Sequence, residues 1–214
     1  QAVKTAIDQG RFGKIRMIIA NVLWSRPQDY YNQAKWRGTF AMDGGVFMNQ
    51  ASHYVDIVNW LMNEQAVSVF ANTKTLERNI EAEDTGIATI EWKSGAIASI
   101  NVTTLTYREN LEGSITILGE KGTVRVGGIA MNEIQHWMFE DERPEDKEII
   151  ATNYATESVY GFGHKRYYEN VIKVLRGEEA ALVDGEEGLK SLELLSAIYQ
   201  SGREGKVVKL PLER

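Results

Sequence analysis

Six short segments rich in Ile, Val and Thr follow one another between residues 66 and 139, and this succession constrains the fold more than any other feature of the sequence. Two of the connections are very short: Lys93-Ser94-Gly95 and Gly119-Glu120-Lys121-Gly122. Short connections that contain glycine are typical of β-hairpins. Because parallel strands need a long crossover instead, these segments predict an antiparallel sheet. The expected strands are 66–76, 85–92, 95–106, 113–119, 122–128 and 133–139.

An earlier β-rich segment and three amphipathic segments complete the expected elements. Residues 14–24 predict a further strand, and the spacing of apolar residues predicts helices over 44–62, 163–177 and 187–202. Several strands carry Ala, Ser and Thr on one side and Ile or Val on the other. The sequence therefore predicts an α+β fold, an open, mainly antiparallel sheet with helices packed on one face and solvent or a second subunit on the other.

The composition fits a single globular domain and excludes several classes of protein. The chain has 214 residues, of which 43% are hydrophobic and 25% charged, enough for a sizeable core. The net charge is −6 and the basic residues are scattered, so no nucleic-acid partner is expected. No apolar run approaches the roughly 18–20 residues of a membrane span, and no membrane partner is expected. The absence of cysteine excludes disulfides and thiolate chemistry and is typical of cytoplasmic proteins.

The first residues read as the last turns of a helix that ends at two glycines, Gly10 and Gly13. We expect residues 1–10 to be the tail of a helix from an N-terminal domain that is missing here. Residues 11–214 are then expected to form one domain.

The predicted helix over 44–62 carries the strongest candidate for a catalytic group. Asn49 and His53 are four residues apart, so a continuous helix would present both side chains next to each other. Histidine can exchange a proton with a substrate hydroxyl near neutral pH. The alternative is a histidine bonded to Asp56 or to solvent without a chemical role, and the residue types alone favour that alternative. The buried stripe of the helix is expected to contain Phe47, Ala51, Tyr54, Val58 and Leu61.

Gly44 and Gly45 precede this helix, where glycines let backbone N–H groups approach a ligand closely. The alternative is a plain junction with Asp43 as the helix N-cap. The long loop before them is rich in basic and aromatic residues. Guanidinium groups bind phosphate or carboxylate, and aromatic rings cover sugars or bases. A nucleotide sugar or another anionic ligand would suit this loop, and a solvated loop fixed by its aromatic residues is the alternative. The residues concerned are Arg26, Tyr30, Tyr31, Lys35, Trp36 and Arg37.

Other kinds of site are weakly supported. The three histidines, His53, His136 and His164, lie far apart and form no metal-binding pattern, so no metal is expected. Ser52 adjoins His53, but neighbouring helical side chains do not face each other, which argues against a nucleophilic triad. The stretch GFGHKR at 161–166 has no third glycine and follows no clear strand, so no dinucleotide fingerprint is expected. His164 begins the next helix and either contacts an anion or is simply exposed.

The glycine pair, the polar residue four positions before a histidine and the segment HYVDIVNWL resemble the Gfo/Idh/MocA oxidoreductases. The resemblance continues through EDTGIATIEWKSGAIASI, GSITILGEKGTVRV and both C-terminal helices, and so covers nearly the whole chain. It corresponds to the C-terminal, substrate-binding half of such enzymes. Their N-terminal Rossmann domain, with its glycine fingerprint and a catalytic Lys, would hold NAD or NADP. No cofactor is expected to bind this chain alone beyond edge contacts.

The family's usual signature is D-x-x-x-H, and this sequence has Asn49 in its first position. Asparagine cannot accept a proton, so the resemblance implies that His53 and the Lys of the missing domain exchange it. Asn49 would then orient a hydroxyl group or a ring.

The stretches Trp36-Arg37-Gly38, ERNIEAEDTG and LEGSITILGEKGTVR resemble the branch that oxidises the 3-hydroxyl of UDP-2-acetamido-2-deoxy-glucuronic acid. The resemblance implies a nucleotide-sugar ligand and a homo-oligomer formed through the open face of the sheet. Two alternatives stay open: a non-catalytic module for sugar-nucleotide binding or oligomerisation, and a dehydrogenase of another sugar or cyclitol. The residues expected to bind the substrate are Trp36, Arg37, Gly44, Gly45 and His164.

Overall fold

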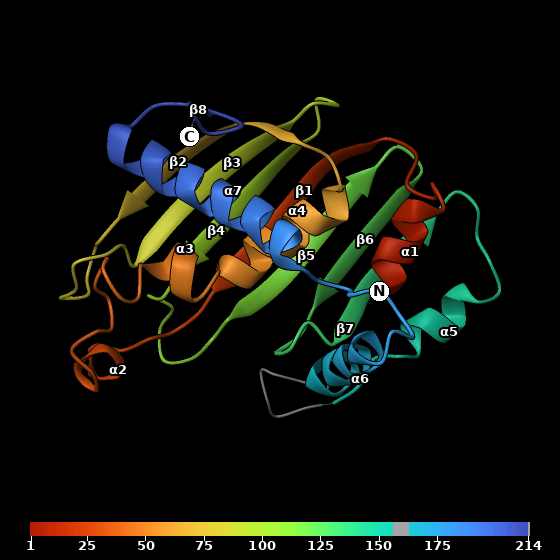
Figure 1. The fold of residues 1–214 in the computed structure, drawn as a ribbon, viewed down its shortest axis with the longest axis horizontal. Coiled ribbons are helices and arrows are strands. Elements are labelled where there is room, and N and C mark those ends of the chain that lie inside the picture. Colours follow the sequence, from red (N-terminus) through yellow and green to blue (C-terminus); the bar gives the residue numbers. More distant parts are fainter. Residues whose placement is uncertain (156–162, 214) are drawn as a thin grey trace.

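Eight strands form one sheet in the computed structural model, which describes residues 1–155 and 163–213 (Figure 1). Their order across the sheet is β7-β6-β5-β1-β4-β3-β2-β8. Among these strands β1 and β4 run parallel, and every other neighbouring pair is antiparallel. The predicted open, mainly antiparallel sheet is therefore confirmed. The bounds are β1 Ile15–Leu23, β2 Ala66–Lys74, β3 Thr85–Trp92, β4 Ile97–Thr103, β5 Glu112–Gly119, β6 Gly122–Gly127, β7 Glu133–Phe139 and β8 Val208–Lys209.

Helices cover one face of this sheet, as the alternation of residues along the strands predicted. Figure 1 shows α7, α4, α3 and α1 on the same side of the sheet, with α7 packed on β2 and α4 against β1 and α7. Helix α5 packs against the edge strand β7, and α6 lies near it. No described helix combines the length and the apolar character needed to cross a bilayer. The bounds are α1 Ala2–Asp8, α2 Gln28–Asn32, α3 Val46–Asn49, α4 Ser52–Met62, α5 Asp146–Ile150, α6 Gly163–Leu175 and α7 Gly185–Glu204.

The hydrophobic core lies between the covered face of the sheet and helices α4 and α7. Alternate residues of the central strands, such as Ile18 and Ile100, are fully buried against Val55 of α4 and Ile198 of α7 within one apolar cluster. The five stripe residues predicted for the helix over 44–62 are all buried as well. Burial of such side chains contributes about 25 cal/mol per Å² of apolar surface, which makes this layer the main source of stability.

The structure corrects one prediction, because the expected helix over 44–62 is two helices. Helix α3 ends at Asn49 and α4 begins at Ser52. Between them the Ala51 N–H donates to the Val46 carbonyl, five residues back, which widens the turn, and Ala51 becomes the N-cap of α4. Asn49 and His53 therefore do not share a continuous helix. The helical spacing no longer supports placing their side chains next to each other, and their proximity stays a prediction.

Two expectations lie outside what the structure tests. Helix α1 forms as expected and buries Ala6, but the assignment of residues 1–10 to another domain stays a prediction. In the GFGHKR stretch, residues 161–162 lie outside the described residues.

Arg11 joins the loop after α1 to the segment that follows β7. Its guanidinium donates to both carboxylate oxygens of Asp146, at 2.7 and 2.8 Å, and its Nε donates to Asp141 at 3.0 Å. The Phe139 ring lies 4.2 Å from the guanidinium carbon. Hydrogen bonds from Arg11 first, and then from Trp137 and the Arg143 backbone, hold the pKa of Asp146 well below its usual value.

Asp146→Asn should lower the free energy of unfolding by about 1–3 kcal/mol near neutral pH, since it removes the charge from the hydrogen bonds made by Arg11. The native pKa of Asp146 is depressed, so its contribution is present above the unfolded-state pKa of about 4 and is lost as the pH falls. Urea unfolding near pH 7 and near pH 3 should show the difference from wild type shrinking in acid. Asp8→Asn, at an exposed pair with Lys4, is the control and should change little.

Candidate active site

Asn49 is the centre of a polar chain that joins helix α3 to the loop before it. Its Nδ2 donates to the Asp43 carboxylate, and its Oδ1 accepts a hydrogen bond from Gln50. Gln50 Nε2 also lies 3.5 Å from the Tyr30 hydroxyl, and Asp43 accepts the Gly38 N–H at 2.6 Å. These contacts fix the orientation of the amide. One N–H and one oxygen lone pair of Asn49 are left for a ligand.

Arg37 and Trp36 lie at the other end of this chain. The Arg37 guanidinium carbon is 4.1 Å from the centre of the Tyr30 ring and 5.5 Å from that of Trp36. Its Nη1 donates to the Tyr30 carbonyl at 2.8 Å and to Gln33 at 3.1 Å, while its buried Nε has no hydrogen-bond partner among the described residues. No carboxylate pairs with Arg37 in the described part of the chain. Its charge is thus available to an anion.

Arg26 adds a second cation to the same aromatic group. Its guanidinium carbon lies 5.5 Å from the Tyr30 ring centre and 5.3 Å from that of Trp24. Among the described residues, the guanidinium donates to two neutral acceptors, the Ser25 carbonyl at 2.7 Å and Asn110 at 3.2 Å. Two guanidinium groups thus lie on one tyrosine ring, whose hydroxyl is linked to Asn49 through Gln50.

His53 is exposed on the first turn of α4, and among the described residues its side chain makes no hydrogen bond. The Asp56 carboxylate accepts a hydrogen bond from Ser191 of α7 instead of pairing with the histidine. The alternative in which Asp56 binds the His53 ring is therefore wrong for this structure. The catalytic role of His53 stays a prediction.

The structure does not bring His164 to this group of residues. It is an exposed residue at the start of α6, and Figure 1 shows this helix apart from α2 and α3. A substrate contact by His164 is still only a prediction.

The N–H groups at the start of α3 are used within the chain. The Tyr199 hydroxyl accepts the N–H groups of Gly45 and Met48 at 3.0 and 3.1 Å. The Glu83 carboxylate accepts the Phe47 N–H at 3.0 Å. The backbone carbonyl of Glu83 accepts the N–H of residue 46, also at 3.0 Å. A ligand cradle built from these donors, which the glycine pair suggested, is therefore closed. Substrate contacts by Gly44 and Gly45 stay a prediction, but the backbone N–H groups at the start of α3 are not free to make them.

Gly45 has a structural reason to be glycine. A Cβ atom at this position would lie 1.9 Å from Glu83 Oε2, so only glycine leaves room for the carboxylate. Asp43, the alternative N-cap, contacts Asn49 instead, and Gly45 itself is the N-cap residue of α3. Sequence reasoning missed Glu83, Tyr199 and Gln50 as parts of this region. Glu83 and Tyr199 are far from it in the sequence and are brought to it only by the tertiary structure.

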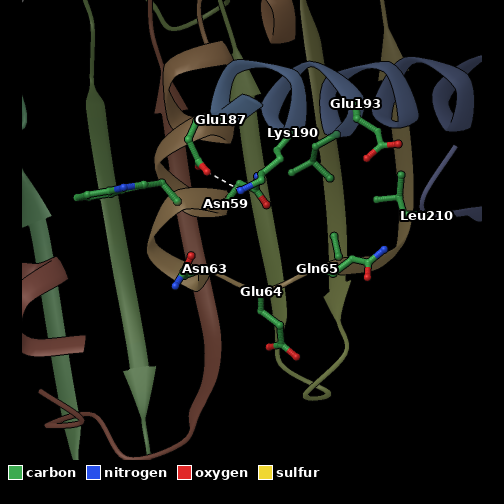
Figure 2. Close-up of a pocket in the computed structure, with 11 residues that line it drawn as sticks. Asn59, Asn63, Glu64, Gln65, Glu187, Lys190, Glu193 and Leu210 are labelled. Carbon is green, nitrogen blue, oxygen red and sulfur yellow. Dashed lines mark hydrogen bonds and ion pairs between the residues drawn. The ribbon is translucent and has the colours of Figure 1, made fainter. Parts of the chain in front are cut away.

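A hollow of about 880 Å³ adjoins Gly44 on the side of α7, a size within the range of small-molecule pockets. Its lining includes the apolar residues Phe40 and Met48 and two cations, Lys74 and Arg203. A second, smaller pocket of about 380 Å³ lies between the end of α4 and the first half of α7 (Figure 2). It shares no residue with the polar chain around Asn49. Its lysine, Lys190, already pairs with Glu187, three residues earlier in the same helix.

Within the residues that the structure describes, no group of three or more His, Cys, Asp or Glu side chains could hold a metal ion.

Comparisons with known proteins establish the family. The model described as "Oxidoreductase family, C-terminal alpha/beta domain" matches residues 4–210. The chain therefore belongs to the Gfo/Idh/MocA oxidoreductase family and corresponds to its C-terminal domain. Among curated proteins, an inositol 2-dehydrogenase of Rhizobium meliloti is 26% identical over 98% of this chain and 61% of its own length.

Two solved structures are much more similar. The WlbA dehydrogenase of Bordetella pertussis, in complex with NADH and UDP-GlcNAcA, is 60% identical with a TM-score of 0.93, over 99% of this chain and 61% of that one. The WlbA dehydrogenase of Chromobacterium violaceum, in complex with the same two ligands, is 57% identical with a TM-score of 0.91, over 100% of this chain and 60% of that one. The chain thus spans about three fifths of the length of these relatives.

Gly45→Ala should destabilise the protein by roughly 1–3 kcal/mol, because its Cβ would displace the Glu83 carboxylate from the start of α3. Gly188→Ala is the matched control: it lies within α7 with no atom in the way of a Cβ and should stabilise the helix by up to about 1 kcal/mol. Thermal or urea unfolding measures both changes. Equal stability of the two variants would contradict the packing described for Gly45.

Proposed function

We propose that the full-length protein containing this chain is an NAD-dependent dehydrogenase that oxidises the 3-hydroxyl of a UDP-N-acetyl-hexuronic acid. The observation that carries the proposal is the 60% identity, over nearly the whole chain, to an enzyme solved with NADH and UDP-GlcNAcA. The two guanidinium groups on the Tyr30 ring support it, because a UDP-hexuronic acid offers a diphosphate, a carboxylate and a sugar ring.

In this proposal each side chain has one task. His53 accepts the proton that leaves the sugar hydroxyl. Asn49, whose amide is fixed by Asp43 and Gln50, donates to or accepts from that hydroxyl with its remaining N–H and lone pair. Arg37 binds the carboxylate or a phosphate, and the exposed Trp36 ring covers the sugar.

The dinucleotide would be held mainly outside this chain. The described residues contain no glycine-rich turn between a strand and a helix of a βαβ unit, which is what binds a dinucleotide in a Rossmann domain. The bound nicotinamide supplies the acceptor for the hydride that leaves the sugar carbon. We propose NAD rather than NADP because the similar solved enzymes contain NADH. Two expectations stay predictions: that this chain binds no cofactor on its own, and that the protein is cytoplasmic.

The relatives named for inositol oxidation define the second candidate, a cyclitol dehydrogenase. They are only 26% and 24% identical to this chain. Inositol has no anionic group, so a cyclitol substrate would leave the charges of Arg26 and Arg37 unused. This comparison favours the nucleotide sugar.

We further propose that the open face of the sheet forms a homo-oligomer interface. Exposed apolar residues lie on it, including Phe70 on β2, Ile87 on β3 and Ile97 on β4. They border a row of bonded polar side chains in which Asn101 donates to Asn21 at 2.9 Å. An apolar and internally satisfied polar surface is what a subunit interface contains.

His53→Gln in the full-length protein should lower kcat for UDP-GlcNAcA oxidation by about 10²–10⁴-fold, with a much smaller change in KM, because a positioned general base is lost. The measurement is NADH formation with UDP-GlcNAcA and, in a parallel series, with myo-inositol. Asp56→Asn is the control from the same helix, and its kcat should stay near wild type because Asp56 contacts Ser191. Wild-type turnover of inositol but not of the UDP-sugar would refute the substrate proposal.

The double variant Ile87→Lys/Ile97→Lys should convert the full-length oligomer into smaller species, since it introduces two charges on the open face. Size-exclusion chromatography with light scattering measures the mass. Leu76→Lys, an exposed residue in the loop after β2, is the control and should leave the mass unchanged. A monomeric wild type would contradict the proposed interface.

A further inference from the structure

Glu83 and Tyr199 together occupy every backbone donor in the first turn of α3. The N–H groups of residues 45–48 donate in turn to the Tyr199 hydroxyl, the Glu83 carbonyl, the Glu83 carboxylate and again the Tyr199 hydroxyl, all within 3.0–3.1 Å. The first N–H groups of a helix have no partner inside it, and a buried donor without a partner costs about 1–3 kcal/mol. This turn therefore depends on two residues from distant parts of the chain.

The two side chains also hold each other. The Tyr199 hydroxyl donates to Glu83 Oε1 at 2.8 Å. Burial raises the pKa of both groups, so the tyrosine keeps the proton that it donates. Glu83 is only 5% exposed and lies two residues before the start of strand β3, while Tyr199 belongs to α7. The position of the α3 turn is thus fixed from both the sheet and the helix layer.

The turn leads directly to Asn49. The Asn49 N–H donates to the Gly45 carbonyl at 2.9 Å, and the Gly45 N–H donates to the Tyr199 hydroxyl. Gly45 therefore links Tyr199 to the backbone of Asn49. Asp43, which accepts from the Asn49 amide, lies two residues before Gly45. A shift of the turn would move both the amide and the group that orients it.

We propose that Glu83 and Tyr199 are positioning residues for the oxidation step, acting through Asn49. This inference rests on the proposed function, in which Asn49 orients the reacting hydroxyl. A displacement of about 1 Å in an active site can cost 10²-fold in rate, so even a small shift of the turn would be visible in kcat.

The test uses the full-length enzyme and Tyr199→Phe, which removes one hydroxyl and leaves two backbone donors without an acceptor. We expect kcat to fall by about 10–100-fold with a much smaller change in KM. Glu83→Gln keeps the acceptor for the Phe47 N–H and should retain most of the activity, whereas Glu83→Ala should lose as much as Tyr199→Phe.

Ser201→Ala is the matched control. Ser201 is a buried residue of the same helix that accepts the Ala71 N–H at 2.9 Å and donates to the Lys206 carbonyl, so its loss weakens α7 without touching α3. This variant should lose stability but keep kcat. A kcat reduced as much in Ser201→Ala as in Tyr199→Phe would show a general structural effect and overturn the proposal.

A double-mutant cycle tests whether Tyr199 acts through Asn49. In an Asn49→Ala background, Tyr199→Phe should cost little further activity, and additive losses would refute the coupling. Hydrogen exchange gives a readout that is independent of turnover: the amides of Gly45 and Met48 should exchange faster in Tyr199→Phe and not in Ser201→Ala. A wild type that does not oxidise the UDP-sugar would refute the proposed function, while an active wild type with unchanged kcat in Tyr199→Phe would refute only this inference.

Discussion

Strand β1 joins the two halves of the sheet, and the rest of the molecule is arranged around it. On one side it pairs antiparallel with β5, which continues into β6 and β7, and on the other it pairs parallel with β4, which continues into β3, β2 and β8. Without it there would be two smaller sheets, each with an unpaired edge. Its residues Ile18, Ala20 and Val22 are all fully buried under the helices, so the same strand supplies both the backbone pairing and the middle of the core.

The candidate site lies where the chain leaves this strand. After Leu23 the chain runs through α2 and α3 before it returns to the core as α4. This excursion is fixed by hydrogen bonds to the segment between β2 and β3: Arg78 donates to the Arg26 carbonyl at 2.8 Å, and the N–H groups of residues 81 and 82 donate to the Gly38 carbonyl. The Asp84 carboxylate in turn accepts the N–H groups of residues 76–78. A long excursion with only two short helices is thus held in place around Asn49 and Arg37.

The covered and open faces of the sheet are adapted to different tasks. The covered face is apolar and packs against α4 and α7, while the open face combines exposed apolar residues with bonded polar ones. Arg125 pairs there with Glu112 at 2.7 Å, and Glu112 also accepts from Asn21 at 3.0 Å. Polar groups that are already satisfied within one subunit can be covered by another without leaving unpaired donors. This division would let one domain carry the candidate site at its edge and the proposed interface on its open face.

The sequence by itself determined the strands, the longer helices, the mainly antiparallel pairing and the family, but not the short helices α2 and α5. Period-two alternation and short glycine turns depend on neighbouring residues, so they are readable from local sequence, and the strands 85–92 and 133–139 appear as predicted. The tertiary structure decided the central place of β1, the break between α3 and α4, and the partners of Asn49. These depend on contacts between residues far apart in the chain, such as Glu83 and Tyr199 with the α3 turn, for which the sequence contains no periodic signal. The glycine pair was recognised as important, but only the fold shows that the space at Gly45 is filled by a carboxylate of the same chain.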